Sequence, residues 1–142
     1  ADARRDATQA LAHLAADEAF REQLAAWGAL PPLCAQLASA AQPDARVRAC
    51  ALSAVANVSF VDAAALVAAG AIPRLAELLF EGEQATLRMS LTALLNLLGA
   101  TDAGAVPAAQ LLQGGIAHAL TALLQHLHAD IRQQALLVTG AL

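Results

Sequence analysis

Leucine and valine recur along the chain at steps of three and four residues, which is the spacing of one face of an α-helix. The clearest stripes are Leu52, Val55 and Val58, and Leu87, Leu91, Leu94 and Leu98. No run alternates apolar and polar residues with a period of two, and valine and isoleucine are sparse. The pattern argues against a sheet and predicts an all-α chain.

Shorter apolar stripes follow the glycines of the chain, and we expect them to form the inward faces of shorter helices. These stripes are Leu75, Leu78 and Leu79, and Leu120, Leu123, Leu124 and Leu127. One such unit cannot bury its stripe alone, whereas stacked neighbours produce a continuous core.

The chain also repeats itself. Gly28, Gly70 and Gly115 lie 42 and 45 residues apart, and residues 27–33 match residues 69–75, with 114–120 as a looser match. Periods of about 40 to 47 residues are typical of repeats of two or three helices. The glycines suit the left-handed backbone that ends a short helix.

Two further markers have nearly the same period. An asparagine lies near the end of each long stripe, at Asn57 and Asn96, and His13 occupies the corresponding place earlier in the chain. An apolar residue followed by arginine opens each long helix, in the pairs Val47-Arg48, Leu87-Arg88 and Ile131-Arg132. Prolines suit the first turns of the following helices, and Asp44 is expected to cap the helix that runs to about residue 60.

This arrangement resembles the armadillo repeat, which has a short first helix, a glycine turn, a second helix opening near proline, and a long third helix ending near Ala-Leu-Ser-Asn-Leu. The matching segments are Gly70-Ala71-Ile72-Pro73 with Ala93-Leu94-Leu95-Asn96-Leu97, and Gly28-Ala29-Leu30-Pro31 with Ala54-Val55-Ala56-Asn57-Val58. The resemblance implies a right-handed α-solenoid. HEAT-like repeats, which share the period, are the alternative, and the glycine turns and the helix-ending asparagines favour armadillo.

We divide the single solenoid segment 1–142 by these markers. A third helix of a leading repeat occupies about 2–16, two full repeats occupy about 18–60 and 62–99, and a partial repeat occupies about 105–142. Because the chain opens and closes inside helical patterns, we expect it to be part of a longer armadillo-repeat protein or of a larger complex.

The resemblance implies a non-catalytic scaffold that binds an extended peptide or a partner protein along the concave surface of its third helices. In the family, the asparagine near the third-helix end hydrogen-bonds the peptide backbone, so Asn57 and Asn96 are the candidate binding residues, with Ser53 and Thr92 one turn earlier. An amide offers both a donor and an acceptor. The alternative is that each asparagine ties down its own turn. His13 is a further candidate, and the last repeat has Gly140 or Ala141 in this slot.

Departures from the family limit the choice of ligand. Nuclear import adaptors carry a tryptophan one turn before the asparagine, where this chain has Gln9, Ser53 and Thr92. Acidic residues are also missing there, so basic signals fit poorly. Catenin-like grooves are strongly basic, whereas only Arg5 and Arg88 are placed to contribute here. The predicted groove is small and polar.

Trp27 is the only tryptophan of the chain. It ends a first helix just before Gly28, where the next repeat has Ala69. Two interpretations remain: Trp27 packs against the preceding repeat, or it is an exposed anchor for a partner, since tryptophan is enriched at binding hot spots.

Composition excludes other classes of function. The net charge is −4 and the arginines are scattered, which argues against nucleic acid as a partner. The apolar stretch 49–73 is rich in alanine and interrupted by Asp62 and Gly70, so we expect no membrane span. No cofactor, metal or catalytic residue is predicted; His126 and His128, two residues apart, are expected on different sides of a helix.

Two cysteines, Cys34 and Cys50, are too few for a disulfide framework and predict free thiols in a reducing compartment. We expect a cytoplasmic protein, with the nucleus or a cilium as alternatives. Two alternative functions remain beside the peptide scaffold. One is a structural segment of a cytoskeletal or ciliary assembly, and the other is an armadillo-like chaperone cofactor.

Overall fold

The computed structural model describes residues 2–38, 44–80, 83–100 and 105–142, and for 105–107 the backbone alone. Within these ranges the chain is helical and contains no strand. The helices are α1 (Asp2–Ala16), α2 (Glu18–Arg21), α3 (Gln23–Ala26), α4 (Leu30–Ala35), α5 (Ala45–Val58), α6 (Ala63–Ala68), α7 (Ala71–Leu78), α8 (Gln84–Gly99), α9 (Ala105–Gln113), α10 (Ile116–Leu123) and α11 (Ala129–Ala141). The predicted all-α solenoid is confirmed.

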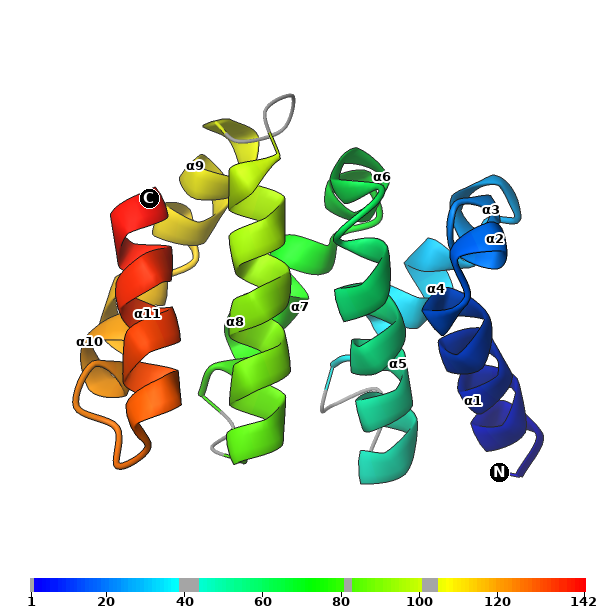
Figure 1. The fold of residues 1–142 in the computed structure, drawn as a ribbon, viewed down its shortest axis with the longest axis horizontal. Helices are drawn as coiled ribbons and strands as arrows, with labels where there is room; N and C mark the ends of the chain where they lie inside the picture. The colour runs from blue at the N-terminus through cyan, green and yellow to red at the C-terminus, as the bar shows by residue number, and fades with distance from the viewer. Residues whose placement is uncertain (1, 39–43, 81–82, 101–104) are drawn as a thin grey trace.

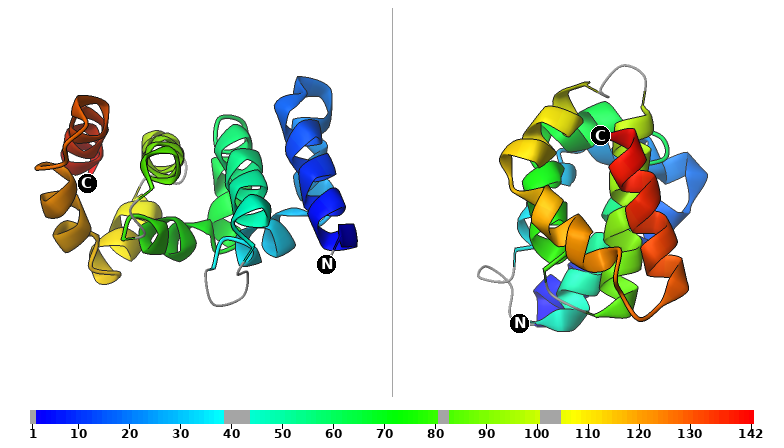
Figure 2. Two further views of the ribbon diagram at one scale, coloured as in Figure 1. Left: turned by 90° about the horizontal axis from the view of Figure 1, so that it is seen from below. Right: turned by 90° about the vertical axis from the view of Figure 1, so that its left-hand side faces the viewer.

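The long helices α1, α5, α8 and α11 stand side by side in sequence order, with the two termini at opposite ends of the row (Figure 1). The short helices α4, α7 and α10 lie behind this row, and the views in Figure 2 show the two layers. Each long helix packs on the next one, so the chain has the stacked arrangement of a solenoid.

Glycine turns separate the short helices of each repeat. Gly28, Gly70 and Gly115 have φ angles of 66°, 81° and 75°, which is the left-handed region predicted for them. Gly70 and Gly115 directly precede α7 and α10. Asp44 caps α5 as expected, because its side chain accepts a hydrogen bond of 2.9 Å from the backbone N–H of Arg46.

One cluster of buried residues runs from α1 to α11 and joins all the repeats. Its largest members include Leu52, Leu75, Leu87, Leu91 and Leu94, and the stripes predicted for α5, α7 and α8 are buried throughout. The predicted burial at the end of the chain is partly wrong. Leu120 and Leu123 are buried, but Leu124 is 36% and Leu127 is 87% exposed. The reason is that α10 stops at Leu123, so Leu127 lies in the turn before α11 and not on the helix face.

Among the described residues, no helix combines the length and the apolar character that crossing a membrane requires.

Candidate functional site

The exposed side of the row formed by α1, α5, α8 and α11, which we call the third-helix face, carries most of the predicted binding residues. Ser53 and Asn57 lie one turn apart on α5, and Thr92 and Asn96 lie one turn apart on α8. All four are partly exposed, while the residues beside them, such as Ala54 and Ala93, are buried. These four side chains therefore lie on the surface that the sequence pattern predicted for them, and not in the core.

A depression of about 570 Å³ lies between α1 and α5 on this face. It brings together two predicted residues, His13 and Ser53, with Gln9 and the half-buried Cys50. Its remaining lining is small, consisting of Ala12, Ala16 and Ala49. The depression thus offers uncharged polar groups at its edges and short side chains on its floor.

The two asparagines have different surroundings. The Nδ2 of Asn96 donates a hydrogen bond of 2.9 Å to the Oγ of Ser59, which lies just after the end of α5. Ser59 is buried and itself donates to the backbone carbonyl of Ala56 at 2.6 Å. Asn96 therefore joins α8 to the end of α5. Ser59 was not predicted, because nothing in the periodicity shows which atom faces the neighbouring helix.

Asn57 has no such link. Within the described part of the chain its side-chain amide makes no hydrogen bond, although it is partly buried on the same face. The donor and the acceptor of this amide are both open to a ligand. Of the two asparagines, Asn57 is the one whose geometry leaves it free for a partner.

The other predicted residues of α8 are linked to α11. The Oγ1 of Thr92 accepts a hydrogen bond of 3.1 Å from the Nε2 of Gln134 and donates to the carbonyl of Arg88. The guanidinium of Arg88 forms an ion pair of 2.7 Å with Asp130. Gln134, like Ser59, is a cross-helix partner that sequence reasoning missed.

The positive charges expected on this face are thus paired. Arg88 pairs with Asp130, and Arg5 of α1 lies 3.4 Å from the carboxylate of Asp44 at the start of α5. The pKa of Asp130 is lowered: its burial acts to raise it, and the N–H of Ile131 and the charge of Arg88 outweigh that effect. Neither arginine is left as an isolated charge that would attract an acidic ligand.

The Asp44 carboxylate links α1 to α5 and makes stability sensitive to acid. The hydrogen bond from the N–H of Arg46 and, to a smaller extent, the charge of Arg5 hold the pKa of Asp44 below its usual 3.8. The unfolded chain, whose Asp44 has the usual pKa of 3.8, binds the proton more readily than the folded chain. The stability that the Asp44 carboxylate contributes is therefore fully present above pH 3.8 and is lost as the pH falls through the folded-state pKa. We expect urea unfolding to show stability falling in that window. Asp44→Asn, which retains a capping oxygen, should flatten the slope; an unchanged slope would contradict the role assigned to Asp44.

Trp27 lies apart from the third-helix face, at the end of α3. Its side chain is 54% exposed, and its ring centroid lies 6.3 Å from that of Phe20 at the end of α2, which is itself 41% exposed. This exposure favours the second of the two interpretations, an exposed anchor for a partner, which stays a prediction. Trp27 and Phe20 form an exposed aromatic pair.

The prediction that His126 and His128 lie on different sides of a helix is wrong. Both residues lie in the turn after α10, with ring centroids 5.5 Å apart. The Nδ1 of His126 is occupied, because it accepts the backbone N–H of His128 at 3.2 Å. No group of three potential metal ligands occurs among the residues that the structure places.

Both cysteines are free thiols, as predicted. Burial raises the pKa of the Cys34 thiol to about 11, against a smaller opposing effect of the Arg74 guanidinium. Since the thiolate is the reactive form, Cys34 is an inert core residue.

The two-layer stack of short and long helices defines the chain as an α-helical repeat solenoid. The armadillo/beta-catenin-like repeat family matches residues 62–99. The predicted armadillo-type solenoid is therefore confirmed as the fold, and the family match covers one of its predicted repeats. No curated protein matches the chain significantly.

Solved structures of designed proteins have the same fold. Computationally designed armadillo repeat proteins for modular peptide recognition are similar with a TM-score of 0.82 and 24% identity, over 97% of this chain and 57% of theirs. An engineered protein is 26% identical with a TM-score of 0.78, over 96% and 56%. A designed armadillo repeat protein in complex with the peptide (KR)4 is 23% identical with a TM-score of 0.77, again over 96% and 56%. The chain spans a little more than half the length of these proteins.

Proposed function

We propose that this chain is a non-catalytic scaffold that binds an extended segment of a partner protein along its third-helix face. The observation that carries the proposal is the unpaired amide of Asn57 beside the depression that holds Gln9, His13 and Ser53. An extended backbone presents unpaired N–H and C=O groups at every residue, and a side-chain amide can bond to both. The peptide recognition named for the designed relatives supports a peptide as the ligand of this chain as well.

The charges of the face favour an uncharged or polar ligand. Arg5 and Arg88 already have acidic partners, and none of the described residues that line the depression between α1 and α5 is acidic. A strongly charged peptide would lose its hydration without gaining a free counter-charge. This distinguishes the proposed ligand from the basic peptide of the designed relative.

Replacing Asn57 by alanine tests the proposal. We expect peptides selected from a displayed random library against the whole chain to be uncharged. They should bind the Asn57→Ala variant about thirtyfold more weakly, since two hydrogen bonds of about 1 kcal/mol each are lost. Fluorescence polarisation with the selected peptides measures this change. Gln125→Ala, which removes an exposed amide in the turn after α10, is the matched control and should leave affinity unchanged.

Selected peptides that bind the Asn57→Ala variant as tightly as the unchanged chain would overturn this role of the face. A second candidate is a structural segment of a larger assembly, for which the exposed Phe20–Trp27 pair is the supporting observation. Under that candidate, Trp27→Ala would abolish association with the partner while Asn57→Ala would not.

We further propose that the protein works in a reducing compartment such as the cytoplasm. The support is that both cysteines are free and that one of them is buried in the core.

A further inference from the structure

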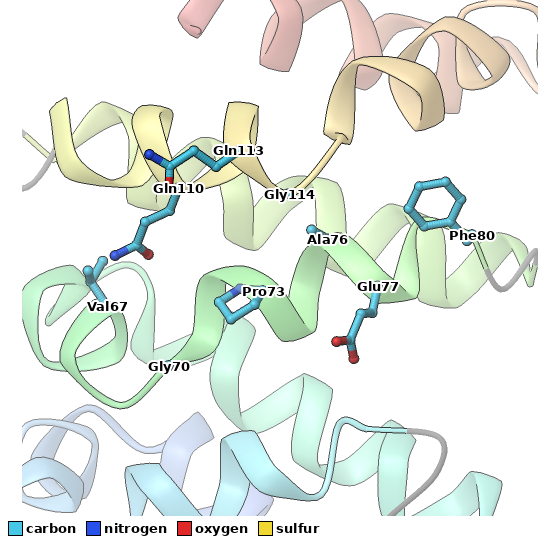
Figure 3. Close-up of a pocket in the computed structure, with 9 residues that line it drawn as sticks. All are labelled: Val67, Gly70, Pro73, Ala76, Glu77, Phe80, Gln110, Gln113 and Gly114. Atoms are coloured by element: carbon cyan, nitrogen blue, oxygen red, sulfur yellow. The ribbon is translucent and has the colours of Figure 1, made fainter.

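A second concave feature lies between the repeats 62–99 and 105–142, among the shorter helices of the other layer. It is a pocket of about 440 Å³ between α7 and the end of α9 (Figure 3). Its lining consists of Val67, Gly70, Pro73, Ala76, Glu77, Phe80, Gln110, Gln113 and Gly114. None of these residues belongs to the third-helix face, so the pocket is independent of the site proposed above.

The repeat register shows that this lining is particular to the second junction. Shifted by the spacing of the glycines, Phe80 corresponds to Ala38, while Gln110 and Gln113 correspond to Ala65 and Ala68. The first junction thus has alanine where the second has an aromatic ring and two amides. Alanine is enough to stack one repeat on the next, so the larger and polar groups are not needed for packing.

The aromatic ring lies open at the edge of the pocket. Phe80 is 57% exposed just beyond the end of α7, although a phenylalanine gains free energy when its ring leaves water. Pro73 and Val67 continue the apolar lining toward the opposite end of the pocket (Figure 3), and Gly70 and Gly114 keep the backbone uncovered. An apolar side chain that enters here would bury this surface.

The charge of the lining selects against a charged occupant. Among the described residues that line the pocket, Glu77 is the only charged one, and both its carboxylate oxygens accept hydrogen bonds of 3.1 Å from Arg74. Figure 3 shows the Glu77 side chain pointing away from α9. A glutamate in the pocket would face this carboxylate without a counter-charge, and a lysine would have to share Glu77 with Arg74, whereas an uncharged side chain needs neither.

The amides provide the polar contacts. Gln110 and Gln113 are three residues apart on one side of α9, and Gln110 reaches from α9 toward Val67 (Figure 3). In the described part of the chain, neither amide has a hydrogen-bond partner. Each can donate to a carbonyl and accept from an N–H, which are the groups that an extended backbone leaves unpaired.

We propose that this pocket is a second binding site, which takes an uncharged extended segment of a partner protein. One apolar side chain of that segment packs against Phe80 and Pro73, and its backbone hydrogen-bonds the amides of Gln110 and Gln113. Recognition by a few apolar contacts and convergent polar groups is usual for a pocket of this size.

The test uses the whole chain, labelled with ¹⁵N, and the probe acetyl-Ala-Leu-Ala-amide. We expect saturable shifts at the side-chain NH₂ groups of Gln110 and Gln113 and at the backbone N–H of Gly114. Replacing both glutamines by alanine should weaken binding about thirtyfold, because two hydrogen bonds are lost. Phe80→Ala should weaken it by a similar factor. The probe acetyl-Ala-Lys-Ala-amide should not saturate these signals.

Matched variants separate this site from the third-helix face. The affinity is read at the backbone N–H of Gly114, and Gln125→Ala should leave it unchanged. Any weaker binding of the leucine probe caused by Asn57→Ala should appear at signals of the third-helix face and not at Gly114, so this proposal and that for Asn57 can fail independently. Three results would overturn the second site: equal shifts with the leucine and lysine probes, an affinity unaffected by the glutamine and Phe80 variants, or shifts of the pocket signals on dilution without peptide. The last result would mean that a second copy of the chain covers the pocket.

Discussion

Replacing Leu94 by alanine is expected to lower the free energy of unfolding by about 3 to 4 kcal/mol, near the middle of the range for buried leucines. Leu94 is fully buried on α8, and α8 packs against both neighbouring long helices, α5 and α11. The loss has two parts: the transfer of the missing methyl and methine groups, and the cavity that the rigid neighbours leave. Because a solenoid is held together by contacts between adjacent repeats, the cavity weakens the stack at its centre.

Urea unfolding followed by circular dichroism measures this loss. Leu127→Ala is the matched control, since that leucine is 87% exposed and its removal should change stability by no more than about 0.5 kcal/mol. Equal effects of the two substitutions would contradict the assignment of Leu94 to the core.

Replacing Gly70 by alanine has the second largest expected effect. Gly70 precedes α7 with φ at 81°, a backbone conformation that costs a residue with a side chain about 1 to 2 kcal/mol. An added Cβ would meet no atom within 4 Å, so the expected loss comes from the backbone alone and not from a clash.

The same substitution at Gly99 is expected to raise the free energy of unfolding and not to lower it. Gly99 ends α8, does not have a positive φ, and also has open space at its Cβ. Gly99→Ala is therefore expected to raise the free energy of unfolding by about 0.5 kcal/mol, because alanine loses less conformational entropy. Thermal unfolding of both variants checks the pair. A loss of stability at both positions would show that the left-handed backbone is not the cause at Gly70.

The local features of this fold could be predicted because their causes are local. A left-handed glycine, a capping aspartate and a leucine stripe each depend on residues within a few positions, and Gly70, Asp44 and Leu91 have the predicted roles. The exposure of Leu127 was not predictable from its spacing alone. Its stripe continues in the sequence past Leu123, where the helix ends.

The contacts between long helices could not be predicted in the same way. The periodicity places Asn96 and Thr92 on the outer face of α8, but whether they meet a neighbour depends on the distance and rotation between helices. The structure pairs Asn96 with Ser59 and Thr92 with Gln134, while Asn57 has no internal partner among the described residues. The same sequence marker thus has a structural role in one repeat and an open amide in another.

Because Asn57 is unpaired and Asn96 is bonded to Ser59, a peptide of the kind proposed above would meet the two ends of the third-helix face at different cost. A peptide that bonds to Asn57 displaces only water, whereas a peptide that takes the donor of Asn96 must first release it from Ser59. Binding of such a peptide is therefore expected to begin at the end of the row formed by α1 and α5. It would extend toward α8 only where hydrogen bonds to the peptide replace the bond between Asn96 and Ser59. Binding that advances past α5 would loosen the join between two repeats, so occupancy of the face and the spacing of its helices would change together.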